Sequence, residues 1–166
     1  MIIRQALDTD FAAIWPIFQQ IAAAGDTYAY DRDISEQEAQ RIWMQLPAKT
    51  FVVVEGESGN EKILGTYYIK TNQAGPGAHV CNCGYMVADA ARGRGLATAM
   101  CEHSQQVAIA LGYQAMQFNF VASTNTGAIS LWEKLGFDTV GRLPRAFELP
   151  AEGFVDALVM FKWLAD

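Results

Sequence analysis

The chain has 166 residues, of which 51% are hydrophobic and 18% are charged, and its net charge is −6 at pH 7. This length suits a single domain spanning residues 1–166 and is too short for two ordinary domains. The acidic balance argues against a nucleic-acid partner, because phosphate backbones attract clustered Lys and Arg. We find neither an apolar run of about 18 residues, as a membrane span requires, nor a secretory leader, so we expect a cytoplasmic protein.

The N-terminal segment predicts a strand followed by a helix. Residues 2–5 read as a short strand, and Asp8 is expected to cap a helix with apolar residues at helical spacing. Pro16 lies inside that helix and should kink or split it, because it lacks a backbone donor. Residues 25–31 are aromatic, acidic and aperiodic, which suits a loop near a ligand.

A second helix and a hairpin are expected next. Ser35 and Glu38 form a capping-box pair that opens a helix ending near Leu46. Two β-branched runs, at residues 51–55 and 63–70, flank a turn and predict a hairpin.

The second half of the chain alternates strands and helices. A strand at residues 78–87 is hydrophobic at successive positions, which implies burial on both faces. The remaining elements are expected at residues 96–111 (helix), 115–120 (strand), 126–135 (helix), and 138–140 and 155–163 (strands). This order predicts an α/β domain with a mixed sheet.

Three cysteines, Cys81, Cys83 and Cys101, raise the question of a metal site, since His79 completes an H-x-C-x-C pattern. Side chains two apart on a strand share a face, but this spacing suits neither a disulfide nor a zinc knuckle. We expect small side chains that fill a buried strand face, and no metal.

The segment Arg92-Gly93-Arg94-Gly95-Leu96-Ala97-Thr98 lies between a buried strand and an amphipathic helix. Free amides at a helix N-terminus bind phosphates, and glycines let the backbone approach them closely. A P-loop requires Lys and Ser/Thr at the end of a longer glycine loop, and neither is in place. A dinucleotide fingerprint requires a third glycine where Thr98 stands, and this segment comes too late in the chain for a first Rossmann unit.

Arg92, Gly95 and Ala97 match Gln/Arg-x-x-Gly-x-Gly/Ala, the acetyl-CoA signature of the GNAT superfamily of N-acetyltransferases. A second block resembles that family's downstream segment, Asn-x-x-Ala-x-x-Leu/Phe-Tyr-x-Lys/Arg-x-Gly-Phe, at the family's interval. Its residues here are Asn125, Ala128, Leu131, Trp132, Lys134, Gly136 and Phe137. A helix face explains the apolar positions of this block but not Asn125.

The resemblance implies the GNAT fold, a twisted and largely antiparallel sheet of about seven strands flanked by about four helices. In that fold the strands expected at 78–87 and 115–120 splay apart and hold the pantetheine arm of acetyl-CoA between them. The residues that the resemblance assigns to the cofactor are Val87, Arg92, Gly93, Arg94, Gly95, Ala97, Thr98 and Asn125.

Many family members carry a Tyr, the acid that protonates the leaving thiolate, where this chain has Trp132. An indole N–H is too weak an acid for that role. Tyr28, Tyr30 and Tyr85 are possible substitutes, although core or loop packing explains each of them as well. The sequence therefore assigns no general acid.

Asn82 and Asn119 each interrupt an apolar strand, and a buried carboxamide without a partner costs about 1–3 kcal/mol. Because the resemblance places both strands beside the thioester, we predict that the pair positions the acceptor. A structural asparagine bonded to main chain is the alternative for each of them.

The sequence thus predicts acetyl transfer from acetyl-CoA to the amine of a small molecule, directly in a ternary complex. The asparagine-bearing strands and the loop at 25–31 look like the subgroup that acetylates proline analogues, and are also similar to phosphinothricin acetyltransferases. A noncatalytic acetyl-CoA-binding module and a protein or peptide N-acetyltransferase are the alternatives. GNAT enzymes are often dimers, so a homodimer is a further expectation.

Overall fold

The computed structural model describes residues 1–57 and 59–165. Its strands are β1 (Ile2–Gln5), β2 (Lys49–Glu55), β3 (Lys62–Thr71), β4 (Val80–Val87), β5 (Ala115–Ala122), β6 (Asp138–Leu149) and β7 (Gly153–Trp163). Its α-helices are α1 (Phe11–Ala24), α2 (Glu36–Gln40), α3 (Leu96–Ala110) and α4 (Thr126–Lys134). Within the described ranges, no helix has the length and apolar character needed to cross a membrane.

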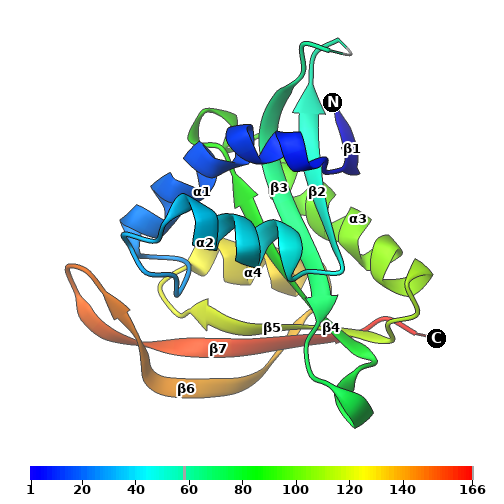
Figure 1. Ribbon diagram of the computed structural model, residues 1–166. Coiled ribbons are helices and arrows are strands. Elements are labelled where there is room, and N and C mark those ends of the chain that lie inside the picture. Colours follow the sequence, from blue (N-terminus) through cyan, green and yellow to red (C-terminus); the bar gives the residue numbers. More distant parts are fainter. Residues whose placement is uncertain (58, 166) are drawn as a thin grey trace.

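One seven-stranded sheet organises the molecule, in the order β1-β2-β3-β4-β5-β7-β6. Neighbouring strands are antiparallel except β4 and β5, which are parallel. Figure 1 shows β2, β3 and β4 upright, whereas β5, β7 and β6 cross beneath them. This mixed sheet with its helices confirms the predicted GNAT fold.

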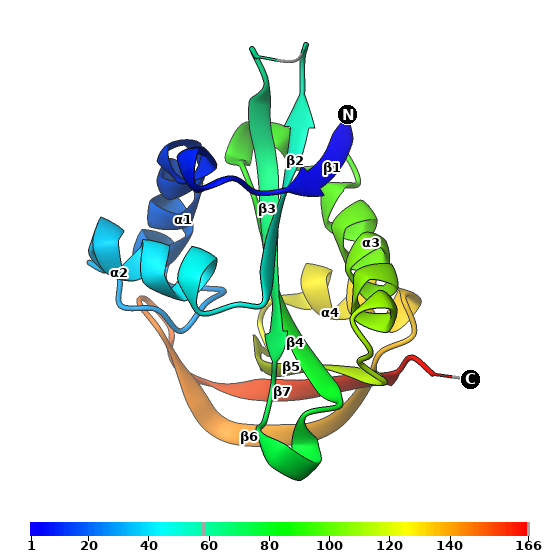
Figure 2. The same cartoon turned by 45° about the vertical axis from the view of Figure 1, so that its right-hand side comes forward.

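The helices cover both faces of the sheet. Figure 2 views the upright strands edge-on, with α1 and α2 on one side and α3 and α4 on the other. Each face has its own hydrophobic core, and alternate residues of β3 supply both: Tyr67 packs on the α3 side and Tyr68 on the α1 side. The central strands are therefore buried on both faces, as predicted for the segment at 78–87.

The entry into α1 differs from the prediction. Asp8 does not cap the helix; it opens a short 3-10 turn, Asp8–Asp10, and the carboxylate of Asp10 accepts the Leu7 amide at 2.7 Å. Pro16 does not split α1, which runs unbroken over 14 residues. Both Pro16 and Ala12, the residue whose carbonyl loses its helical partner, face solvent, where water can replace the missing donor.

The C-terminal hairpin is longer than predicted, because β6 extends to Leu149 instead of ending near residue 140. Most of β6 is exposed, and its pairing with β7 is interrupted by register shifts, one of them between Leu143 and Phe147. Arg145 in this bulge has a φ of 54°. An exposed edge strand with bulges lacks the alternating apolar pattern from which strands are predicted.

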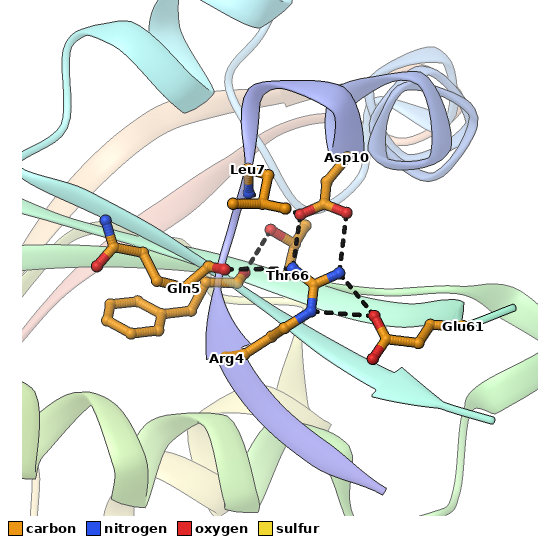
Figure 3. A network of polar contacts seen from close by, with 7 residues as sticks. Arg4, Gln5, Leu7, Asp10, Glu61 and Thr66 are labelled. Atoms are coloured by element: carbon orange, nitrogen blue, oxygen red, sulfur yellow. Dashed lines mark hydrogen bonds and ion pairs between the residues drawn. The ribbon is translucent and has the colours of Figure 1, made fainter. Parts of the chain in front are cut away.

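A partly buried ion-pair network links the N-terminal strand to the turn before α1 (Figure 3). The Arg4 guanidinium donates to both carboxylate oxygens of Asp10, at 2.7 and 3.0 Å, and to Glu61 Oε2 at 2.9 and 3.1 Å. Hydrogen bonding by Arg4 lowers the pKa of Asp10 below its ordinary value. One arginine thus ties together β1, the turn before α1 and the beginning of β3.

We expect Asp10→Asn to lower the free energy of unfolding at pH 7 by about 1–3 kcal/mol, because a charge-assisted bond is lost. The Asp10 contribution is complete above the ordinary Asp pKa of about 3.9 and disappears as pH falls through the lowered pKa of the folded state. The difference between wild type and variant, measured by urea unfolding, should therefore shrink below about pH 4. Asp8→Asn, in the same turn but exposed, is the control; equal effects would contradict this account.

Candidate active site

The site begins where β4 and β5 stop pairing. These parallel strands are in register at Val80–Ala115 and Cys81–Met116, and then diverge. The next side chain, Asn82, spans the opening: its Nδ2 donates to the Gln117 carbonyl at 3.0 Å. The splay predicted for the strands at 78–87 and 115–120 is therefore present, and a side chain closes its apex.

The diverging strands wall a cavity of about 730 Å³, together with parts of β3, α4 and the loop between α1 and α2. A second cavity of about 230 Å³ lies at the glycine turn before α3 and shares Val87 and Gly93 with the first. The predicted site residues that line one or both are Asn82, Val87, Arg92, Gly93, Gly95, Ala97, Thr98, Asn119 and Asn125. The two separate sequence motifs thus meet at two cavities that share lining residues.

The glycine turn leaves the first amides of α3 available. Gly93 and Gly95 both have a φ of +75°, and a Cβ on either would meet no atom within 4 Å. Gly95 precedes the helix without a capping side chain, and the first backbone bond of α3 runs from Ala99 N to Gly95 O. The amides of residues 96–98 therefore face the smaller cavity as donors without helical acceptors, and this geometry fits a pyrophosphate.

The two arginines of this turn are held by carboxylates. Arg92 pairs with Asp89 at 2.9 Å, and Arg94 pairs with Glu55 of β2 at 2.6 Å. Among the described residues that line the two cavities, Arg92 is present and Arg94 is not. Backbone amides, more than guanidinium groups, thus supply the anion-binding character of the turn, and the predicted cofactor contact of Arg94 would be made by its main chain.

Asn125 has a structural role that the sequence analysis missed. Its Oδ1 accepts the Ala128 amide at 3.3 Å, which makes it the N-cap of α4. Asparagine before an apolar-periodic segment is a standard capping signal, so the pattern could have revealed this role. Asn125 also lines the larger cavity, and its contact with the cofactor stays a prediction.

Asn82 and Asn119 line the same cavity but in different environments. Asn82 is buried, as predicted, and its Oδ1 accepts the Tyr68 hydroxyl at 2.9 Å. The prediction that Asn119 is buried is wrong: it is exposed, and it bonds Asn72 at 2.7 Å through its Nδ2. Asn119 lies beyond Cys81–Met116, the last register pair of β4 with β5, so β4 no longer lies beside it, and a register shift between Phe118 and Val121 interrupts the pairing with β7.

Trp132 forms part of the wall between the cavity and the core. It is 8% exposed and packs against Tyr85 and Phe118, with ring centroids 5.2 and 5.0 Å away. The position that holds a tyrosine in many relatives is thus filled by an aromatic packing residue.

The three tyrosines considered as acids are differently engaged. Tyr28 places its hydroxyl on the main chain of β4, donating to the Tyr85 carbonyl and accepting the Tyr85 amide, both at 2.6 Å. The Tyr85 hydroxyl is 2.7 Å from Ser104 Oγ, which itself donates to the Cys101 carbonyl. Burial raises the pKa of Tyr28 and Tyr85, and raises that of Tyr30 to about 12. All three are therefore protonated at neutral pH, and the Tyr85 proton is directed into the core.

The cysteines pack as predicted. Cys81, Cys83 and Cys101 are buried in the core on the α3 side of the sheet. Burial raises the pKa of Cys83 well above its ordinary value, and that of Cys101 as well, which keeps both thiols protonated and poorly nucleophilic.

Two cavity residues of β3, Tyr68 and Lys70, were not singled out from the sequence. They lie on a strand read only as half of a hairpin, and the pairing of β3 with β4 places Lys70 directly opposite Asn82. A pairing between residues this far apart in the sequence leaves no local signal.

The sequence model of the acetyltransferase (GNAT) family matches residues 11–137, which is most of the chain. The chain belongs to the GNAT family. It is 30% identical over 148 residues to N-acetyltransferase aca1 of Schizosaccharomyces pombe, an alignment that covers 81% of this chain and 71% of that protein. These relationships identify the protein as an acyltransferase.

Solved GNAT structures superpose on the whole chain. A GCN5-related N-acetyltransferase from Kribbella flavida has 41% sequence identity and a TM-score of 0.90, covering 98% of this chain and 96% of that one. A GNAT phosphinothricin acetyltransferase from Sinorhizobium meliloti, in complex with AcCoA, has 18% identity and a TM-score of 0.86, covering 99% and 88%. The second likeness is one of fold.

We expect Gly95→Asp in this GNAT protein to weaken acetyl-CoA binding at least about tenfold by calorimetry, because a carboxylate would occupy the anion site at the helix N-terminus. The fold should survive with a loss of about 1–2 kcal/mol for a side chain at positive φ.

Two controls separate charge from strain. Gly95→Asn carries the same shape without charge, and Gly112→Asp places the same side chain at a φ of +89° in open space beyond the far end of α3. Unchanged affinity in Gly95→Asp would mean that the phosphates bind elsewhere.

Proposed function

We propose that this GNAT protein transfers the acetyl group of acetyl-CoA directly to the amine of a small molecule, an amino acid or amino-acid analogue. The observation that carries the proposal is that two cavities with shared lining residues lie beside the fork of β4 and β5. One end offers unpaired helix amides, and the other offers the carboxamides of Asn82 and Asn119. Such an arrangement holds two reactants side by side, which by itself lowers the barrier substantially.

The cofactor end fits acetyl-CoA, which supplies a thioester-activated acetyl group. The amides of residues 96–98 and the Thr98 hydroxyl would hold the pyrophosphate, and the β4 main chain near Val87 would pair with the pantetheine. Among the described strands, none pairs with β5's side of β4 beyond Cys81; the Tyr28 hydroxyl occupies the Tyr85 amide and carbonyl there, and the main chain nearer Val87 would be available to a ligand.

Direct transfer needs no covalent intermediate on the protein. The acceptor nitrogen bonds the acetyl carbon as the carbon–sulfur bond breaks, the amine loses one proton, and coenzyme A leaves as its thiol. Cys83 is the thiol on the cavity wall, and its raised pKa disfavours it as an acyl carrier. The chain's contribution is to bind, orient and desolvate the two reactants.

The acceptor end favours a small ligand. The aromatic rings of Tyr28 and Tyr30 stack with centroids 5.5 Å apart and, with Phe120, line the cavity. Sequence similarity to N-acetyltransferase aca1 supports N-acetylation, and the fold likeness to phosphinothricin acetyltransferases supports a small acceptor. Neither relationship specifies the acceptor.

Thiol release during incubation with acetyl-CoA tests the proposal against its alternatives. We expect release with at least one member of a panel of amino acids, cyclic imino acids and amino-acid analogues, and an N-acetylated product by mass spectrometry. Acetyl-CoA binding without turnover would instead indicate a noncatalytic module. Turnover confined to peptides or proteins would indicate the other alternative.

The asparagines give the sharper test. Asn119→Ala should lower kcat/KM for the best amine about tenfold and leave acetyl-CoA affinity unchanged. Tm should also stay constant, because the Asn119 side chain is exposed. Asn82→Ala should also lower stability by about 1–3 kcal/mol, since it leaves Tyr68 and the Gln117 carbonyl without a partner.

A double variant should lose less activity than the product of the single losses if both carboxamides hold one acceptor. Asn72→Ala removes the Asn119 partner while retaining the Asn119 carboxamide, and serves as the matched control. Full kcat/KM in both single variants would make the two asparagines structural.

A further inference from the structure

Among the described residues, the acceptor end of the cavity has one cationic side chain and no carboxylate. Among the described residues that line the larger cavity, the charged side chains are Lys70 and Arg92, and neither Asp nor Glu is present. Arg92 belongs to the glycine turn and is paired with Asp89. Lys70 is therefore the charge that an acceptor meets, in a protein whose net charge is −6.

The position of Lys70 is fixed by β3 and by its neighbours. Lys70 is paired in register with Asn82 of β4, so the two side chains leave the same face of the sheet. Its Nζ lies over the ring of Tyr68, 5.3 Å from the centroid, and the Tyr68 hydroxyl bonds the Asn82 carboxamide. Ammonium, phenol and carboxamide thus form one polar wall at the apex of the fork.

Among residues 1–57 and 59–165, no acidic side chain forms an ion pair with this ammonium. The ion pairs found in the described part of the chain involve Arg4, Arg41, Arg92, Arg94 and Arg142, and none involves Lys70. Lys70 is half-buried, so its charge acts on a ligand through a medium less screening than bulk water. An anion is attracted to such a site and a second cation is repelled from it.

We infer that Lys70 recognises a carboxylate of the acceptor and so determines specificity for free amino acids over their neutral or cationic relatives. The inference rests on the proposed transfer to a small amine. The Nδ2 groups of Asn82 and Asn119 each use one hydrogen, toward the Gln117 carbonyl and Asn72, and their second hydrogens would complete a carboxylate site of one charge and two neutral donors. Amino-acid amides, decarboxylated amines and peptide N-termini lack the α-carboxylate and are discriminated against.

The test compares acceptors that differ in this group alone. For the best amino acid found in the panel, its primary amide and its decarboxylated amine, kcat/KM is measured by thiol release. Wild type should prefer the acid at least about tenfold, the range expected for loss of one charge-assisted contact. Lys70→Met should lower kcat/KM for the acid about 10–100-fold and leave the amide nearly unchanged.

Further variants keep the result interpretable. Lys70→Arg should restore much of the preference for the acid, and Lys70→Glu should shift preference toward the decarboxylated amine. Lys62→Met, at the exposed opposite end of the same strand and outside both cavities, should match wild type. Acetyl-CoA affinity and Tm should be unchanged in Lys70→Met, which confines the effect to the acceptor.

The outcomes distinguish a failure of the Lys70 role from a failure of the proposed acetyl transfer. Equal kcat/KM for acid and amide in wild type, or an unchanged ratio in Lys70→Met, overturns the role of Lys70 while leaving acetyl transfer to small amines in place. No thiol release by wild type with any member of the panel rejects the proposed function, and the role of Lys70 with it.

Discussion

The site depends on an incomplete strand pairing. Two register pairs join β4 and β5, and beyond them each strand follows a different partner, β3 on one side and β7 on the other. A parallel pair that continued would fill the space with hydrogen-bonded main chain. Because it stops, the molecule gains a cavity through its sheet, and α3 begins close to where β4 ends, with its N-terminal amides at the mouth of that cavity.

An open fork leaves backbone groups without strand partners, and buried groups of this kind must be satisfied otherwise. Asn82 takes over at the apex by donating to the Gln117 carbonyl. Further along β4, the Tyr28 hydroxyl serves both the amide and the carbonyl of Tyr85. The loop between α1 and α2 is thus held against β4 at the edge that β5 leaves unpaired beyond Cys81.

Short sequence patterns predicted those parts of the fold and site that depend on neighbouring residues in the chain. The glycine turn and the order of elements follow from turn chemistry and periodicity, and the indole of Trp132 could be excluded as the acid from its chemistry alone. Features that arise when separate strands pair could not be predicted from such local signals. Asn119 is exposed at the fork, where β4 no longer pairs with β5, the length of β6 comes from its pairing with β7, and Lys70 enters the site because β3 places it opposite Asn82. Asn125 is a different case, because its position before an apolar-periodic segment is a local capping signal that was missed.

Charge is distributed along the cavity in a way that suits the proposed chemistry. Positive potential comes from helix amides at one end and from Lys70 at the other, so a ligand anion is attracted to each. Between them the wall is aromatic, formed by Trp132, Phe118 and Tyr85. An apolar wall disfavours an ammonium and favours the neutral amine, the form that attacks a thioester. With a carboxylate held by Lys70, the acceptor nitrogen would lie in this desolvated middle section, so burial and a nearby cation both help it to lose its proton. Under the proposed function, such a site would obtain a reactive amine without a dedicated base on the protein.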